Sequence, residues 1–391
     1  MLPCRNSVRW MSAAFAVFFV AIVASGRGEP IDVPLSPELW TISQRNFKIP
    51  EPEPPQHNGE AITFFGKPSY HLARGLATSR GAELRNGTID VDFAADDRTR
   101  FFGIAFHVHS DDEYEVVFFR PRNSDTEQAV QYTPGLLGAN VWQLYTGPGY
   151  TAAAHLPRNE WIHAQIVIMG ATAKLFLNHS TEPTLVVQNL KLGQTNGGVG
   201  FWGHLGGGYF ANLQISPDDL TYDAEVKPHF DSRVLSDWEL SDAFDATTTP
   251  ADVFPKVRQM KWEKVHPEDA GMVVINRYRR SPNIDTLENQ QRIKGEVTGA
   301  QVVFARTTIR SDRERTAKLR FGYSDDVTLF LNGKPIYSGN NELGFRQYNF
   351  LGLLNPYADT VYLPLRKGEN ELVLGVTEFF GGWGFQCELV E

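Results

Sequence analysis

Cysteine is scarce in this chain, which has two among its 391 residues, Cys4 and Cys387. Cys4 lies in an N-terminal segment that we expect to be cleaved, so Cys387 would have no partner for an intramolecular disulfide. A disulfide framework is therefore excluded, and hydrophobic cores must stabilise the folded protein.

Positive charge is also scarce, because 37 Lys and Arg residues stand against 46 Asp and Glu residues, and the formal net charge is −9. No stretch of the sequence interleaves a Lys/Arg cluster with aromatic residues. A nucleic-acid-binding protein needs basic side chains for the phosphate backbone. The sequence therefore predicts no nucleic-acid partner.

Long hydrophobic runs are missing beyond the first 26 residues. That segment carries Arg5 and Arg9, then a short apolar stretch over 13–24, then small residues up to Gly26. About a dozen apolar residues are too few to span a bilayer, which needs about 20. We therefore expect 1–26 to be a signal peptide, the mature protein to be secreted or periplasmic, and no membrane span to remain after cleavage. The alternative is an uncleaved membrane anchor.

Convincing amphipathic helices are absent from the first half of the chain, where strand patterns recur instead. The stretch 87–93 alternates strictly, with Ile89, Val91 and Phe93 on one side and acidic residues on the other. Similar runs cover 161–169 and 197–202, and 34 glycines with 23 prolines suit frequent turns. These patterns predict an all-β fold.

The length of the chain favours two domains rather than one. We expect the first over residues 30–216, a polar and acidic linker over 217–233, and a second β-rich domain over 234–391. In the second region, Asn332-Gly333 separates two alternating runs. This dipeptide predicts a two-residue hairpin turn, because both of its central positions need positive φ.

The first half resembles the concanavalin A-like superfamily of lectins and glucanases, including laminin G-like domains. The resemblance covers roughly 40–212 and rests on 86–93, on Glu160-Trp161 with the strand that follows, on 174–178 and on 197–202. It implies a jelly-roll sandwich that binds saccharides on the concave face of one sheet. Members of this superfamily bind glycans, or hydrolyse or eliminate them.

The second half is similar to the galactose-binding-like jelly rolls that accompany carbohydrate-active enzymes. This likeness rests on 324–335 and 365–372. It implies a second β-sandwich and leaves its ligand open, because such modules often serve as structural companions.

A predicted hairpin made of 101–109 and 114–120 supplies the candidate site. With even-numbered residues such as Phe102, Ile104 and Val116 facing the core, the odd-numbered His107 and Glu115 would share the opposite face. Planar polar and aromatic side chains nearby suit a sugar, which stacks on indole rings and needs bidentate partners for its hydroxyl groups. The predicted carbohydrate-binding residues are His107, Glu115, Arg120, Arg122, Gln131, Trp142, Gln143, Tyr145, Trp202 and His204.

These residues lead us to expect an exported carbohydrate-binding protein, with a polysaccharide or glycan as partner and no catalytic residues. The alternative is a polysaccharide-degrading enzyme, either a glycoside hydrolase or a lyase. The Glu-x-Asp-x-x-Glu motif of the related glucanases is absent from the sequence. A hydrolase would have to use pairs such as Asp90 and Asp92, and a lyase would need a base such as His107 or Tyr132. A third possibility is that both sandwiches are scaffolds for protein contacts.

The sequence offers two candidate kinds of metal site, and no cofactor is expected. His107 and His109 have a spacing compatible with metal ligands, and the alternative is that both histidines are only hydrogen-bonded. Structural calcium could bind the acidic turns at 111–112 and 325–326. Acidic turns are usually only solvated.

Overall fold

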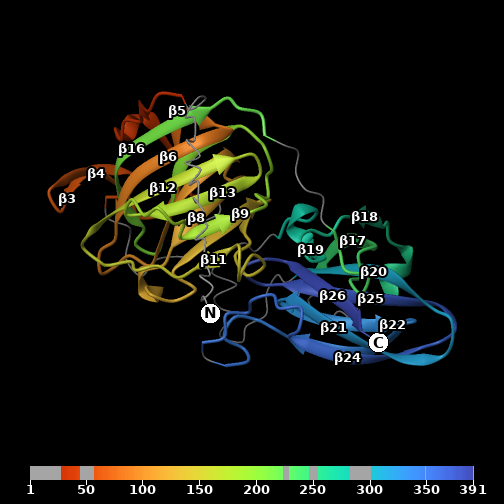
Figure 1. Ribbon diagram of the computed structural model, residues 1–391. Coiled ribbons are helices and arrows are strands. Elements are labelled where there is room, and N and C mark those ends of the chain that lie inside the picture. Colours follow the sequence, from red (N-terminus) through yellow and green to blue (C-terminus); the bar gives the residue numbers. More distant parts are fainter. Residues whose placement is uncertain are drawn as a thin grey trace, which may run out of the picture.

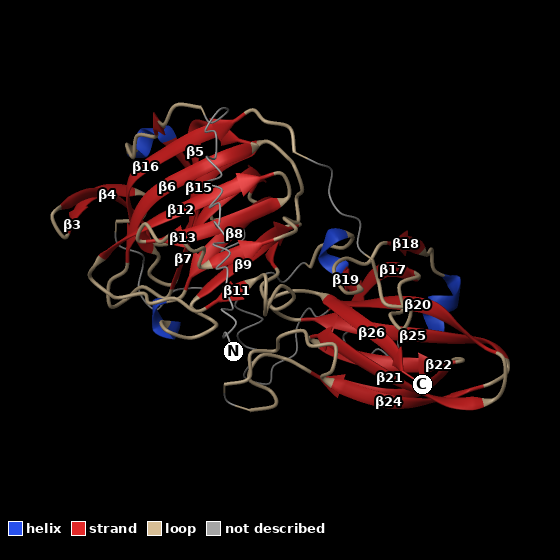
Figure 2. Ribbon diagram, in the orientation of Figure 1, coloured by secondary structure: helices blue, strands red, loops and turns tan. Residues whose placement is uncertain are grey.

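The computed structural model describes residues 28–44, 57–222, 229–245, 254–281, 301–347 and 349–390. The predicted signal peptide and residues 223–228 of the predicted linker lie outside these ranges. Figure 1 shows two β-sandwiches, the first coloured red to green and the second teal to blue, and Figure 2 shows how little helix they contain. The prediction of an all-β, two-sandwich fold is confirmed. Within these ranges, no helix has the length and hydrophobicity that a membrane crossing requires.

The first sandwich consists of two eight-stranded antiparallel sheets. The first sheet has the order β14 (Leu185–Val187), β13 (Thr172–Leu177), β12 (Trp161–Met169), β6 (Asn86–Ala94), β16 (Gly208–Asp218), β4 (Lys67–Leu72) and β3 (Glu60–Phe64), with β1 (Ile31–Asp32) also on β16. The second sheet has the order β10 (Ala139–Asn140), β9 (Val130–Leu136), β8 (Glu113–Phe119), β7 (Phe101–Ser110), β15 (Gly197–His204), β5 (Gly75–Leu84) and β2 (Trp40–Ser43), with β11 (Thr151–Ala152) also on β9.

The core of the first sandwich follows from the period-two pattern of its strands. In β6, Ile89, Val91 and Phe93 are buried, as predicted, because they point at the opposite sheet. Asp90 and Asp92 point outward, where His163 lies 3.4 Å from the first carboxylate and 3.0 Å from the second. The alternating residues therefore divide between an apolar layer and a polar outer face.

The second sandwich has one six-stranded and one four-stranded antiparallel sheet. The larger has the order β18 (Glu263–Val265), β17 (Trp238–Asp245), β20 (Gln301–Ser311), β25 (Gly368–Glu378), β22 (Asp326–Leu331) and β23 (Lys334–Asn340). The smaller has the order β19 (Met272–Val274), β26 (Gly384–Val390), β21 (Arg315–Ser324) and β24 (Asp359–Leu365). Four short 3-10 helices complete the described elements: η1 (Pro37–Leu39), η2 (Pro121–Asn123), η3 (Phe254–Gln259) and η4 (Ile275–Arg277).

The predicted hairpin of the second sandwich is confirmed. β22 and β23 pair across Asn332-Gly333, whose φ angles are 51° and 80°. Both angles lie in the left-handed region that this turn requires and that Asn and Gly tolerate best.

The two sandwiches contact each other through an apolar cluster. Its members come from both: Leu136, Ala139, Val141, Leu144, Tyr145, Met272, Val274 and Leu354. Gln143 lies fully buried beside it and donates a hydrogen bond of 2.7 Å from Nε2 to the carbonyl oxygen of Leu351 in the second sandwich. Gln143 and Tyr145 therefore stabilise this interface, and the prediction that their side chains contact a sugar is wrong.

Candidate functional site

The pairing of β7 with β8 decides which side chains of the predicted site share a face. Ser110 pairs with Glu113 across a two-residue turn, and Phe106 pairs with Glu115. Even-numbered residues of β7 are therefore opposite odd-numbered residues of β8. As a result Glu115 points into the sandwich with Phe106, while Val116 points outward with Ala105.

The expectation that His107 and Glu115 face solvent is wrong, because both side chains are fully buried. His107 lies in a β-bulge with φ 47°, which places its Nδ1 2.6 Å from a Glu115 oxygen. Its Nε2 donates to the carbonyl oxygen of Arg85 at 3.0 Å. Burial also keeps His107 and Tyr132, the bases considered for a lyase, from contact with a polymer.

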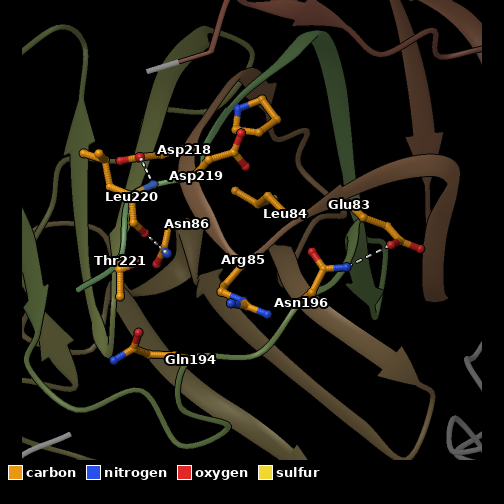
Figure 3. Close-up of a pocket in the computed structure, with 11 residues that line it drawn as sticks. Glu83, Leu84, Arg85, Asn86, Gln194, Asn196, Asp218, Asp219, Leu220 and Thr221 are labelled. Carbon is orange, nitrogen blue, oxygen red and sulfur yellow. Dashed lines mark hydrogen bonds between the residues drawn. The ribbon is translucent and has the colours of Figure 1, made fainter. Parts of the chain in front are cut away.

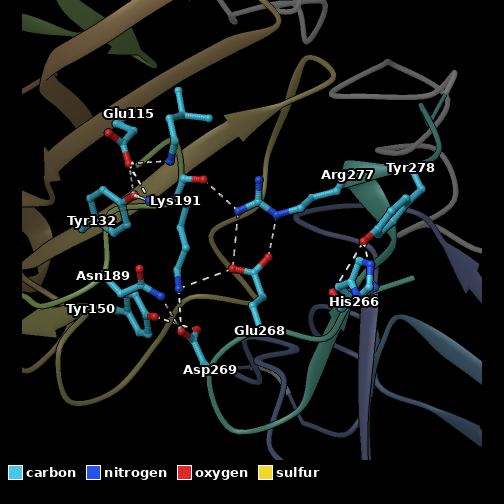
Figure 4. A network of polar contacts seen from close by, with 11 residues as sticks. Glu115, Tyr132, Tyr150, Asn189, Lys191, His266, Glu268, Asp269, Arg277 and Tyr278 are labelled. Carbon is cyan, nitrogen blue, oxygen red and sulfur yellow. Dashed lines mark hydrogen bonds and ion pairs between the residues drawn. The ribbon is translucent and has the colours of Figure 1, made fainter. Parts of the chain in front are cut away.

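Glu115 is the centre of a buried polar network (Figure 4). Besides His107, it accepts hydrogen bonds from the Tyr132 hydroxyl, from the Lys191 amide at 2.7 Å and from the Leu192 amide at 3.2 Å. Burial, together with the nearby charge of Glu115, raises the pKa of Tyr132 well above its usual value. These contacts compensate the loss of water around the Glu115 carboxylate.

The network continues into the second sandwich through Lys191 (Figure 4). Its Nζ lies 2.5 Å from Asp269 and 3.3 Å from Glu268, and its carbonyl oxygen accepts a hydrogen bond from Arg277 at 2.9 Å. We call this group the Glu115 network: His107, Glu115, Tyr132, Lys191, Glu268, Asp269 and Arg277. Its charges are paired with one another, which identifies it as a structural connection between the sandwiches.

The outer face of the same sheet carries a row of residues brought together by cross-strand pairing. Trp202 on β15 is opposite Leu76 on β5 and Gly103 on β7, and Gly103 is opposite Phe118 on β8. Trp202 is only 7% exposed, and its ring centroid lies 5.8 Å from that of Phe118. Trp202 is thus on the expected face but is packed, not open.

Arg120 directly follows β8 and is held in a fixed orientation. Its guanidinium group lies over the rings of Phe118 and Trp142, 4.5 and 5.5 Å from their centroids. It also donates hydrogen bonds to the Gln128 carbonyl oxygen at 3.0 Å and to Gln131. Burial lowers the pKa of Arg120 to about 10. The structure therefore brings together three predicted residues, Arg120, Gln131 and Trp142, of which Gln131 is buried and Trp142 half-buried.

Other cationic side chains gather at this end of the sheet. Arg122 is exposed, and its pKa is lowered by the charge of Arg100 first, then by partial burial and by the charge of Arg158. In the described part of the chain, the guanidinium groups of Arg100 and Arg122 have no ion-pair or hydrogen-bond partner. His204 ends β15, and its ring stacks on Phe101 at a centroid distance of 6.1 Å. We call this group the arginine edge: Arg100, Arg120, Arg122, Arg158, Trp142 and His204.

A separate polar pocket of about 480 Å³ lies where β5 and β16 end (Figure 3). It is lined by Glu83, Leu84, Arg85, Asn86, Gln194, Asn196, Pro217, Asp218, Asp219, Leu220 and Thr221. Some of these polar groups bind each other, as in the 3.0 Å hydrogen bond from Asn196 to Glu83. Among the described residues that line it, none is aromatic, so they offer no ring on which a sugar could stack.

The predicted metal ligands do not converge. The ring of His109 lies 2.8 Å from Glu113 and 3.1 Å from the Asn196 carbonyl oxygen, whereas the ring of His107 contacts Glu115 and the Arg85 carbonyl oxygen. Asp325 is buried and accepts the backbone amides of Phe379 and Phe380 at 2.6 and 2.8 Å. Among the residues described, no three His, Cys, Asp or Glu side chains form a cluster suited to a metal ion. A structural calcium ion stays a prediction.

Two groups of residues escaped the sequence analysis. Lys191, Glu268 and Arg277 carry no local pattern, because Lys191 meets Glu268 and Arg277 only across the two sandwiches. Arg100 and Arg158 lie near acidic residues in the sequence, and Arg158 approaches Asp97 at 3.9 Å. Only the order β8-β7-β15 of the sheet, read together with these arginines, could have indicated the arginine edge.

Comparisons with known proteins give likenesses among solved structures only. No protein-family model matches the chain, and no curated protein matches it either. The chain is similar to a carbohydrate-binding module, CBM66, from Bacillus subtilis, with 13% identity, 46% of this chain and 95% of that chain covered, and a TM-score of 0.32. It is similar to a β-glucanase from Bacillus licheniformis, with 12% identity, coverages of 49% and 99%, and a TM-score of 0.32. It is also similar to galectin LEC-6 from Caenorhabditis elegans, with 13% identity, coverages of 45% and 99%, and a TM-score of 0.27.

Proposed function

We propose that the chain is an exported glycan-binding protein whose ligand lies on the arginine edge. The supporting observation is the half-exposed Trp142 ring, stacked beside the fixed guanidinium group of Arg120. An indole offers a face to the C–H groups of a sugar, and exposed Arg122 offers donors to its oxygen atoms. Export rests on the signal-peptide pattern of residues 1–26.

The free energy contributed by stacking is large relative to the total binding free energy of a weak complex. Covering about 100 Å² of the indole contributes about 2.5 kcal/mol. A complex with a millimolar dissociation constant has about 4 kcal/mol in total. Loss of the Trp142 ring should therefore remove detectable binding.

The test is affinity electrophoresis of wild type and Trp142→Ala through gels containing soluble polysaccharides. A matched control is Trp262→Ala, because Trp262 carries an equivalent stack on Arg306, at 4.2 Å, in the second sandwich. A second control, Phe380→Ala, removes the contact of Trp142 with the second sandwich and keeps its stack on Arg120. We expect retardation to be lost in Trp142→Ala alone. Retardation that survives this substitution, or no retardation by any polysaccharide, contradicts the proposed function.

A further inference from the structure

The arginine edge concentrates positive charge on a protein that is acidic overall. The chain carries a formal net charge of −9, yet Arg100 and Arg158 each lie near enough to Arg122 to lower its pKa. Grouping like charges is unfavourable unless counter-charges balance them. Arg158 has such a balance in Asp97, at 3.9 Å, whereas Arg100 and Arg122 have none in the described ranges.

Position in the sheet explains how these charges come to be adjacent. His204 at the end of β15 pairs with Phe101 at the start of β7, and the Arg100 amide donates to the Leu205 carbonyl oxygen at 3.0 Å. Phe102 pairs with Phe119, so Arg120 and Arg122 follow β8 at the same end. With strands about 4.8 Å apart, the edge from β15 through β7 to β8 extends about 10 Å. A surface of this length is wider than a single small anion and can contact a segment of a polymeric ligand.

The remaining groups of the edge suit a saccharide better than a bare anion. Burial, with the nearby charges of Arg74 and Arg100, lowers the pKa of His204 to about 4, so this ring is neutral at pH 7. A neutral imidazole can exchange hydrogen bonds with hydroxyl groups. The Trp142 ring adds an apolar surface that phosphate or sulfate ions alone would not use.

We propose that the ligand of the arginine edge is an anionic polysaccharide, with carboxylate or sulfate groups held by Arg100 and Arg122. This inference rests on the proposed function and narrows it to one class of glycan. Arginine binds carboxylate and sulfate oxygens through two parallel N–H donors, which gives both charge and geometry.

The experiment measures the affinity of the full chain for polygalacturonate, sulfated dextran, neutral dextran and double-stranded DNA, at low and high salt. The variant is R100A/R122A, and the matched control is R310A/R313A, which removes two exposed arginines from the second sandwich. We expect R100A/R122A to lose at least tenfold in affinity for the anionic polymers, or about 1.4 kcal/mol. The control should bind like wild type. R100K/R122K should be intermediate, because lysine keeps the charge without the paired donors.

The outcomes separate this inference from the function on which it rests. Equal losses in R100A/R122A and R310A/R313A would mean that only overall charge matters, which overturns the inference. Equal binding of neutral dextran and of the anionic polymers overturns the inference and leaves glycan binding intact. Equal binding of double-stranded DNA overturns it in favour of general polyanion binding. Binding of no polysaccharide overturns both proposals.

Discussion

The two ends of the β7–β8 hairpin carry charge in opposite ways. Near the turn, Glu115 is buried and each of its interactions is with a fixed protein group. At the open end, Arg122 is exposed and its guanidinium group has no protein acceptor among the described residues. A buried charge must be compensated by the protein itself, whereas an exposed charge is available to another molecule. The same hairpin therefore supplies both a structural centre and a candidate binding surface.

The largest expected effect tests whether the turn end is structural. Glu115→Ala leaves His107, Tyr132 and two backbone amides without their acceptor. Breaking a buried pair of this kind typically destabilises a protein by about 3–5 kcal/mol. Urea unfolding followed by fluorescence should show this loss, while Glu113→Ala on the exposed part of the same strand should stay within about 0.5 kcal/mol. Similar unfolding midpoints for the two variants would contradict a structural role for Glu115.

The next effect concerns the connection between the sandwiches. Lys191→Met removes the ammonium group that lies 2.5 Å from Asp269 and 3.3 Å from Glu268. We expect a loss of about 2 kcal/mol, less than for a fully buried pair because both carboxylates are partly exposed. The unfolding curve should also broaden or divide, as the sandwiches lose a shared contact. Lys264→Met, which removes an exposed pair with Asp237 at 3.0 Å, should leave the curve unchanged. If the unfolding curve of Lys191→Met matches that of this control, Lys191 does not connect the two sandwiches energetically.

The smallest effect is a pH dependence at the open end. The pKa of His204 is lowered to about 4 in the folded protein, by burial first and then by Arg74 and Arg100, against about 6.5 in an unfolded chain. Between these values the unfolded chain binds the proton and the folded protein does not. The contribution to stability is therefore complete above pH 6.5 and is lost as the pH falls towards 4.

Thermal unfolding at pH 7 and pH 4.5 checks this dependence. Wild type should lose more stability between the two values than His204→Phe, which keeps a ring against Phe101 and cannot be protonated. Equal losses in the two proteins would show that folding does not lower the pKa of His204. The arginine edge would then gain the positive charge of His204 near pH 6.5 instead of near pH 4.

The sequence pattern was enough to predict the strands and the inner face of β6, because alternation depends on neighbouring residues alone. It was not enough for Glu115, whose face depends on the register of two strands. Across a two-residue turn, even-numbered residues pair with odd-numbered ones, as Ser110 pairs with Glu113. Applied to this hairpin, the rule predicts that Glu115 points into the core. No pattern in the neighbouring sequence predicts the β-bulge at His107.

The candidate site was predicted only in part, because its residues are distant in the sequence. Arg120, Trp142 and His204 were expected on one surface and do gather at one end of the sheet. Arg100 and Arg158 were missed, since their proximity to Arg122 requires the tertiary fold. Gln143 and Tyr145 were misassigned for a similar reason, because the second sandwich covers them.

The adjacency of Trp142 and Gln143 has a mechanical consequence. Gln143 is tied to the second sandwich by its side chain and by both of its backbone groups, which bond to Gly381 at 3.0 Å and Leu354 at 2.8 Å. The backbone next to the indole is thereby fixed before any ligand arrives, which reduces the entropy lost on association. The second sandwich thus restrains the segment that carries Trp142, and its Phe380 ring also contacts the indole, at a centroid distance of 6.2 Å.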